Sequence, residues 1–566
     1  MLQAPTFTAF IETTTGDEPL GSAIPNERLI AQAIPGINNV VRHIRVYSAI
    51  CWMVRQIHAK GRNSKDPDMR EISRAGMAKI QLLLTWFGLE EELQGLAGAS
   101  RKFPKDNKPV ILDFQKILSK ANQNRKDNED LDVRDGMQYI EAVQYGPSLF
   151  NGLRFLNGAN DDDIPYVLTG AGERLADAYE HAIRRHARRE WLRDPMRRKV
   201  RHEEVLDMAK MLSLKEPSDR EKNAFLAQYY PKNAPTEDSI GWGNRQATLS
   251  LALLAIREES RCASASNTSG ISLEAIRYAM ARGTARDGTS IVEPGLEQVQ
   301  QWWAELQLRQ YFRAGHDLLF RLCEQWILYA TAHKFPRDID DCAEAIASLV
   351  SEVLPVGYSD TVAQTASQFE KNQADCFSLY AAGLKHSQLD LQVRRAGIEA
   401  VRESPLTTEN QIQSAVREAY LALIFSAVEC GNFLKAGYKL RTTFTGRLTL
   451  DALRELVLEK FRESSPEEFL AHLIKHHVLL QHFHVAQERT TNESSRARIA
   501  VGDMGLERVS KAKRVSAVNV LPDRLLSGLR LLAECDLVEV HDLKTPHFQL
   551  TEKGGAHLND VLRNLT

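Results

Sequence analysis

The densest group of residues that could do chemistry lies between Arg184 and Arg201, in the stretch RRHARREWLRDPMRRKVR. Nine of these residues are Lys or Arg and two are acidic. Such a stretch can neutralise phosphates and give sequence-independent affinity for nucleic acid that falls with salt. The alternative is a solvated face whose cations pair with acids such as Glu190, Glu203 and Glu204. The nucleic-acid hypothesis names Arg184, Arg185, Arg188, Arg189, Arg193, Arg197, Arg198, Lys199 and Arg201, on one long basic helix.

A second candidate is the pair Arg309 and His316, in RQYFRAGH. Their spacing fits the loose Arg-x4–6-His pattern of HEPN-type ribonucleases, in which the pair would handle a phosphate and its proton transfer. The pattern is permissive, because many helical proteins of this size contain it by chance. A helical ribonuclease is therefore kept as an alternative function.

Five histidines lie between His472 and His484, and His472 and His476 have the i, i+4 spacing that can suit zinc. No glutamate follows the first of them as in HExxH, and no cysteine is near, so no metal site is predicted. The chain contains neither GxxxxGK[ST] nor GxSxG. The motifs thus predict no cofactor and favour a protein that is not an enzyme.

Two stretches with the same order of residues are expected to position the basic residues. Residues 149–156 (LFNGLRFL) align with 525–532 (LLSGLRLL), and 168–172 (LTGAG) align with 550–554 (LTEKG). Each copy predicts a short amphipathic helix, a turn, an apolar strand ending in Leu-Thr, a glycine break and a closing helix. This order resembles a winged-helix module, in which a recognition helix enters the major groove and a wing touches phosphate. Winged helices also serve as protein-interaction and dimerisation modules, and that interpretation stays open.

The two copies would offer different contacts to DNA. The first has a recognition helix at Pro147–Leu156 that is expected to expose Ser148, Asn151 and Arg154. Its loop carries Asp161–Asp163, which would repel phosphate. It is therefore interpreted as the mount of the arginine helix. The second copy offers four candidates, Arg524, Ser527, Arg530 and Lys544.

A helix is expected after the Pro35-Gly36 break, and Asn38 or Asn39 is expected to cap it. Basic residues then follow close to its N-terminus, where the helix dipole disfavours cations. They are Arg42, His43 and Arg45. We therefore expect each of them to have a partner.

The same stretch carries a resemblance to a protein family. Its residues are Pro35-Gly36-Ile37-Asn38-Asn39, Arg42-His43-x-Arg45-x-Tyr47-Ser48 and Trp52. The stretch resembles the opening of certain large bacterial proteins encoded near anti-phage defence genes. The resemblance covers about thirty residues and the general layout of a helical body with a winged-helix-like end. It implies a prokaryotic defence protein, and it assigns no catalytic residue.

Composition limits the remaining classes of protein. The 566 residues are too many for one core, and 43% hydrophobic with 26% charged residues is ordinary for a soluble protein. No apolar run reaches membrane-spanning length, and the first ten residues do not read as a signal peptide. Seven scattered cysteines, with no zinc spacing among them, predict free thiols in a reducing cytoplasm. A net charge of −2 does not indicate that the protein as a whole binds nucleic acid, so a local basic stretch matters more than the sum.

The sequence therefore predicts a mainly α, multidomain protein with two winged-helix-like modules. The expected segments are 1–100 (helical), 101–182 (first module), 183–217 (basic helix and linker), 218–463 (helical body), 464–514 (rich in His) and 515–566 (second module). The leading hypothesis is a non-enzymatic, DNA-associated subunit of a defence complex that docks partners such as an ATPase or a nuclease. The alternatives are the ribonuclease and a kleisin-like scaffold of an SMC-type ATPase. Membranes are not expected as partners, and homo-oligomerisation is left open.

Overall fold

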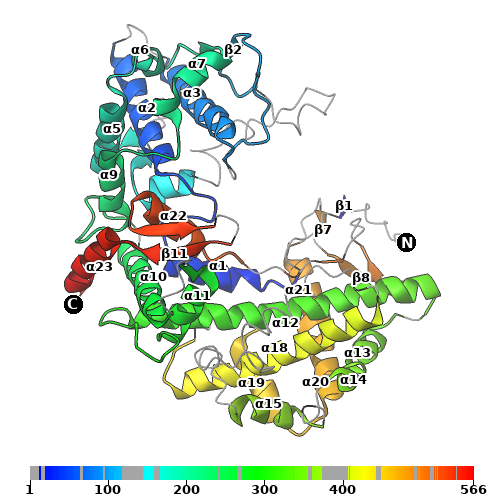
Figure 1. Cartoon of the computed structure of the whole chain (residues 1–566). Helices are drawn as coiled ribbons and strands as arrows, with labels where there is room; N and C mark the ends of the chain where they lie inside the picture. Colours follow the sequence, from blue (N-terminus) through cyan, green and yellow to red (C-terminus); the bar gives the residue numbers. More distant parts are fainter. Residues whose placement is uncertain are drawn as a thin grey trace, which may run out of the picture. The chain divides into compact units, whose positions relative to one another are not determined.

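The fold was obtained as a computed structural model (Figure 1). The structure describes residues 12–13 and 19–565, except for the segments 64–67, 94–95, 118–144, 159–165, 240, 264–269, 336, 355–357, 359, 372–405, 407, 441–447, 490–493, 496, 510–514, 517, 519–520 and 543–544. The chain is mainly helical, as the sequence predicts. It divides into two compact units. No helix in the described part has the length and apolarity needed to cross a membrane.

Unit 2 is discontinuous in sequence and takes in residues 30–276, 291–299 and 522–566. Its helices are α2 (Ile44–Arg62), α3 (Met69–Glu90), the π-helix η2 (Ser148–Gly152), α5 (Gly170–Ile183), α6 (Arg189–Arg193), α7 (His202–Asp207), α8 (Ala209–Leu212), α9 (Asp219–Tyr229), α10 (Trp242–Cys262), α22 (Leu525–Glu534) and α23 (Glu552–Leu565). Its strands are β2 (Val110–Ile111), β3 (Leu156–Gly158), β4 (Tyr166–Leu168), β5 (Lys199–Val200), β6 (Ile271–Ser272), β10 (Val538–His541) and β11 (His547–Leu550).

Helix α2 is the centre of unit 2 and packs on α3, α5 and α9 (Figure 1). Its N-terminus is not capped by an asparagine. Asn38 instead accepts from the backbone N–H groups of residues 40 and 41, ahead of the helix. The N–H groups of residues 42 and 43 donate to the Tyr145 hydroxyl, and that of Ile44 donates to Glu534 at 2.6 Å. A carboxylate at this position satisfies an orphan amide and complements the helix dipole.

Two of the three basic residues at the start of α2, His43 and Arg45, have the partners that were expected. His43 Nδ1 lies 2.8 Å from Glu534 Oε1. Arg45 is 3% exposed and pairs with Glu221, which is fully buried, at 2.9 Å. The Ser48 hydroxyl also donates to Glu221 at 2.6 Å. These contacts fasten the N-terminal part of α2 to the rest of unit 2.

The two copies of the repeat have the same backbone construction. Thr169 caps α5, because its hydroxyl accepts from the N–H of Gly172 at 3.1 Å. In the second copy the Thr551 hydroxyl accepts from Gly554 at 2.9 Å. The backbone N–H of each threonine donates to a carbonyl in the preceding turn, Phe155 in the first copy and Leu537 in the second. The hairpins β3–β4 and β10–β11 have equivalent registers, with Leu156 opposite Leu168 and Val538 opposite Leu550.

Both copies pack against the segment that joins α1 (Ala23–Ala33) to α2. A Cβ added at Gly36 would lie 2.8 Å from the carbonyl oxygen of Gly152, in the first copy. A Cβ added at Gly528, in the second copy, would lie 3.1 Å from a methyl group of Ile34. The glycine of each NGLR or SGLR motif therefore allows a close approach to the same connection. The Pro35 carbonyl between these contacts accepts from the fully buried Arg245.

Unit 1 takes in residues 1–29, 277–290 and 300–521. Its elements are α12 (Glu297–His333), α13 (Ile339–Ala347), α14 (Val350–Val353), α15 (Val362–Lys371), α18 (Glu409–Lys435), α19 (Leu450–Glu455), η3 (Leu456–Lys460), α20 (Pro466–Leu473), η4 (Ile474–Leu479), α21 (Leu480–Arg489), β1 (Glu12–Thr13), β7 (Ser494–Ser495), β8 (Ile499–Gly502) and β9 (Gly505–Arg508). The boundary between the units falls inside α1, α11 (Leu273–Arg282) and α12.

The core of unit 1 is built on α12 and α18, which run side by side (Figure 1). Gly315 permits this closeness, since a Cβ there would lie 2.7 Å from Leu423. Helix α12 also buries charge. Glu324 is fully buried and receives hydrogen bonds from Arg498 at 3.0 Å, from Arg508 at 3.3 Å and from the Ser516 N–H at 2.6 Å. These bonds fix the β8–β9 hairpin against the long helix.

Candidate nucleic-acid interface

The stretch from Arg184 to Arg201 is not one long helix, and that prediction is wrong. Helix α5 ends at Ile183 with Arg184 as its C-cap, and α6 covers only Arg189–Arg193. Pro195 then follows at a turn, and Lys199–Val200 form β5, which pairs with β2. Proline cannot continue a helix without losing a hydrogen bond, so the arginines are spread over two turns, a short helix and a strand.

Most of these arginines are held by acids, as the solvated-face alternative anticipates. The ion pairs are Arg188–Glu204 at 2.7 Å, Arg188–Asp207 at 3.7 Å, Arg189 with Glu180 and Glu190, Arg193–Glu190 at 3.8 Å, Arg197–Asp194 at 3.4 Å, Arg198–Asp113 at 3.1 Å and Arg201–Glu203 at 3.8 Å. Arg184, Arg185 and Lys199 form no ion pair within the described ranges, and all three are exposed.

Arg184 and Arg185 directly follow α5, and their charges act on His181 in its last turn. Burial and then the charges of Arg184, Arg220 and Arg185 lower the pKa of His181. Arg220, in the first turn of α9, is exposed and forms no ion pair with any described residue. We call these three arginines the arginine cluster. Since α5 packs on α9, residues separated by 35 positions in the sequence act on one histidine.

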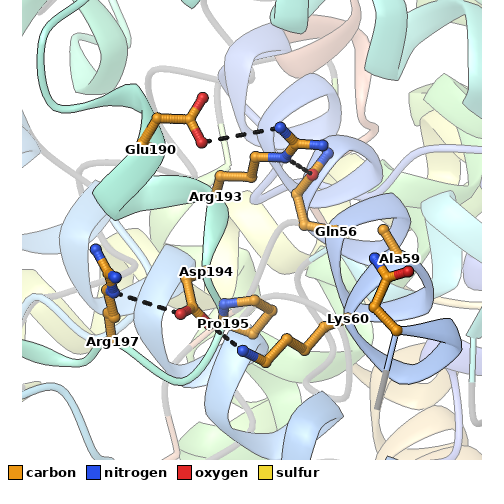
Figure 2. A pocket seen from close by; sticks show the side chains of 9 residues that line it. Gln56, Ala59, Lys60, Glu190, Arg193, Asp194, Pro195 and Arg197 are labelled. Atoms are coloured by element: carbon orange, nitrogen blue, oxygen red, sulfur yellow. Dashed lines mark hydrogen bonds and ion pairs between the residues drawn. The ribbon is translucent and has the colours of Figure 1, made fainter.

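A pocket of about 290 Å³ lies between α2 and α6 (Figure 2). Its cationic lining consists of Lys60 from the last turn of α2, Arg193 from α6 and Arg197 from the following turn. Lys60 and Arg197 both reach toward Asp194, at 3.3 and 3.4 Å. Arg193 lies 3.3 Å from the side-chain oxygen of Gln56 and 3.8 Å from Glu190.

The turn that forms one wall of this pocket is held by a buried lysine. The Lys79 ammonium donates to the carbonyl oxygens of Trp191 and Asp194, the latter at 2.9 Å, and it lies 3.8 Å from the centre of the Trp191 ring. These carbonyls lie at the end of α6, where the N–H groups of Lys79 satisfy acceptors that the helix leaves without a backbone partner. Burial lowers the pKa of Lys79 to about 6.

The module residues that were predicted to contact nucleic acid are less accessible. Ser527 is 5% exposed, and no residue of α22 is fully exposed. Arg524 donates to the Ile34 carbonyl, and Arg530 is half-buried, so burial lowers its pKa. Lys544 lies outside the described residues, as do the three aspartates of the first loop. Nucleic-acid binding by this set stays a prediction, but Ser527 would need the packing of α22 to change.

The first copy also differs from its predicted helix. Pro147–Leu156 contains a single π-helical turn, Ser148–Gly152. Ser148 is buried and hydrogen-bonds to the Tyr47 hydroxyl at 2.8 Å, so it faces the core. Asn151 is exposed. The prediction that this helix exposes Ser148 is therefore wrong, and the interpretation of the first copy as a mount stays a prediction.

Arg309 and His316 both lie on α12, and their side chains are buried in unit 1. Arg309 is 8% exposed and hydrogen-bonds to Glu305 at 2.7 Å. His316 is fully buried and donates from Nδ1 to the Phe312 carbonyl, and burial lowers its pKa to about 4. A neutral, buried imidazole cannot exchange a proton with a substrate at the surface. The ribonuclease alternative gains nothing from this placement.

The histidine-rich segment contains a fully bonded core histidine. His482 Nδ1 donates to the Pro19 carbonyl at 3.0 Å, and Nε2 accepts from the backbone N–H groups of residues 498 and 499. This pattern fixes a neutral tautomer, and burial lowers the pKa. Among the described residues no three or more His, Cys, Asp or Glu side chains are arranged to hold a metal ion.

The sequence did not single out Arg220 or Lys60 as parts of a basic site. Arg220 stands among acids, in Ser-Asp-Arg-Glu, and Lys60 ends an amphipathic helix. No local signal marks either residue, because each joins the site only through the packing of α9 or α2. No family model, curated protein or solved structure matches this chain.

Proposed function

We propose that this protein binds DNA through the phosphate backbone and acts as a non-enzymatic subunit of a larger complex. The observation that carries the proposal is the arginine cluster, Arg184, Arg185 and Arg220. Its members are exposed, form no ion pair with described residues and act together on His181. Three such guanidinium groups have donors available for phosphate oxygens in the planar geometry that phosphate favours.

The ion-paired arginines contribute less to this proposal than the cluster does. A phosphate that binds Arg188 or Arg198 must first compete with Glu204 or Asp113. A partly exposed pair of this kind is worth about 1 kcal/mol, roughly fivefold in affinity. The cluster involves no such competition, so it should supply most of the counterion release on binding.

A salt titration of DNA binding tests the proposal. The affinity of a short duplex is measured by fluorescence anisotropy between about 50 and 200 mM salt. The variant Arg184→Gln/Arg185→Gln/Arg220→Gln should reduce the slope of log K against log salt by about 2.7, or 0.9 for each of three phosphates. At the lower salt concentration this should also be the variant that loses most affinity.

The matched control removes the same charge from paired positions, with Arg188→Gln, Arg189→Gln and Arg198→Gln. It should change the slope by less than about 1. Equal slopes for the two triple variants would refute the cluster as the contact. No affinity of the wild-type protein for duplex at low salt would end the proposal, and tighter binding of single-stranded RNA would redirect it.

In this proposal the two repeat copies are winged-helix-like modules, and the first of them positions the arginine cluster. Thr169 and Thr551 cap equivalent helices after equivalent hairpins, which supports one ancestral design. The first module leads directly through α5 into Arg184 and Arg185. Mounting is thus the part that it would play in binding DNA.

Docking of partner subunits is the second part of the proposal. Unit 1 exposes large apolar side chains around the end of α12 and in the β8–β9 hairpin, among them Tyr329, Phe335, Val501 and Met504. Such side chains are enriched where proteins bind one another. The defence setting rests on the resemblance of the α2 stretch. Co-purification with the products of neighbouring genes tests both the docking of partners and the defence setting. The variant Tyr329→Ser/Phe335→Ser should no longer bind the partner, while its DNA affinity should be unchanged.

A further inference from the structure

The pocket beside α6 brings three cationic groups to one cavity. Lys60 comes from α2, while Arg193 and Arg197 lie on either side of Pro195. Figure 2 shows their side chains around the same space. With Glu190 and Asp194 as its two carboxylates, the lining carries one positive charge more than negative.

The ion pairs between these cations and the two carboxylates are long. The three ion pairs measure 3.3, 3.4 and 3.8 Å. A charge-assisted hydrogen bond between such groups is about 2.7–2.9 Å. The shorter pairs of the same stretch, such as Arg188–Glu204 at 2.7 Å, reach that range. Arg193 and Arg197 are therefore tethered in position but keep bonding capacity for another anion.

Arg197 and Asn63 both add hydrogen-bond donors to the lining of the pocket. Arg197 has Asp194 as its ion-pair partner, so most of its five guanidinium donors are available. The Asn63 side chain, just after α2, lines the pocket and makes no hydrogen bond with any described residue. Lys79 donates a hydrogen bond to the carbonyl of Asp194, and this bond fixes the turn that carries Arg197.

We propose that this pocket binds a phosphoryl group. Guanidinium groups match the oxygens of a phosphate in a fork, and a phosphate can contact more donors at once than a carboxylate can. A volume of about 290 Å³ is at the lower end of small-molecule sites and suits a phosphomonoester or a mononucleotide. The phosphoryl group can come from a free nucleotide or from the 5′ end of a nucleic-acid strand. The lining contains no residue of the arginine cluster, and the inference goes beyond the proposed function without depending on it.

Calorimetric titration of the full chain with inorganic phosphate, AMP, and an oligonucleotide with or without a 5′-phosphate tests this proposal. At least one phosphorylated probe should bind, and Arg193→Gln/Arg197→Gln should weaken it by at least about tenfold. Arg257→Gln, which removes one exposed charge from α10, should leave the affinity unchanged. AMP binding identifies a free-nucleotide site, whereas preference for the 5′-phosphorylated strand identifies a strand end.

Two outcomes overturn the proposal. One is the absence of binding for every phosphorylated probe, and the other is equal affinity for the wild-type protein and Arg193→Gln/Arg197→Gln. The variant Arg184→Gln/Arg185→Gln/Arg220→Gln separates the two proposals. If it loses duplex DNA but keeps AMP or phosphate, the cluster and the pocket are independent sites. If duplex DNA fails to bind while AMP binds, only the proposed DNA function fails.

Discussion

Neutralising Glu221 should destabilise unit 2 more than any surface change. Arg45 uses all five of its N–H donors, two on Glu221 and three on the carbonyls of Lys210, Ser213 and Glu216. Glu221 in turn accepts from Ser48 and from Ser218, the N-cap of α9. Glu221→Gln removes the only carboxylate of this network and places an amide N–H₂ against the guanidinium.

The magnitude follows from burial. Arg45 is 3% exposed and Glu221 is fully buried, so the charge that remains cannot be rehydrated. Removing one partner of such a pair costs about 3–5 kcal/mol. In a unit of this size that lowers the melting temperature by on the order of 10 °C. The double variant Arg45→Met/Glu221→Met should lose less than the two single variants together, because no uncompensated charge is left.

Urea unfolding combined with hydrogen exchange measures the effect and locates it. Exchange should rise in peptides from α2 and α9 of the Glu221→Gln protein. Glu203→Gln is the control, since Glu203 is half-exposed and its ion pair with Arg201 is 3.8 Å long. Its cost should stay below about 1 kcal/mol. Equal effects of the two Glu→Gln changes would refute the reasoning, since burial would then not decide the cost.

Two further predictions concern the repeat and the core of unit 1. Gly172→Ala and Gly554→Ala should each destabilise unit 2 by about 1–3 kcal/mol, because the new methyl group would meet a carbonyl oxygen of the preceding turn, whereas Gly243→Ala, with nothing near its Cβ, should cost under about 1 kcal/mol. Similar melting temperatures for all three would contradict the shared close approach. His316 has a folded pKa of about 4, below its ordinary 6.5, so its contribution to stability is complete above pH 6.5 and is lost as the pH falls toward 4. That loss amounts to about 3 kcal/mol, and His316→Leu should flatten unfolding free energy against pH over this interval; an unchanged profile would contradict it.

The repeat was predictable from sequence because its signals are local. A threonine cap, a glycine at the close approach and an apolar strand lie within a few residues of one another, and each acts on its own backbone. The closing helices after Thr169 and Thr551 were therefore predicted correctly, whereas the short helix expected in the first copy is a π-helical turn. The long basic helix failed for a related reason. Charge density along residues 184–201 suggested one element, although Pro195 already marked a turn.

The composition of the basic site could not be predicted in the same way. Arg188, Arg189 and Arg198 looked equivalent to Arg184 in sequence, but tertiary packing gives the first three nearby acids. Two of those acids are Asp113 and Glu180, and each lies at least nine residues along the chain from the arginine with which it pairs. Pairing across elements decides which cations are available, and a single sequence carries no direct record of it.

The discontinuity of unit 2 has a consequence for how the chain is made. Ribosomes add about 5–20 residues per second, so the segment 522–566 emerges about 12–50 s after residue 276. During that interval the N-terminus of α2 lacks its hydrogen bond to Glu534. The Ile34 side chain also lacks its packing against Gly528. The nascent chain thus holds an incomplete domain while unit 1 is synthesised. A premature stop before residue 522 should yield a protein that is retained by chaperones or degraded, rather than a smaller folded one.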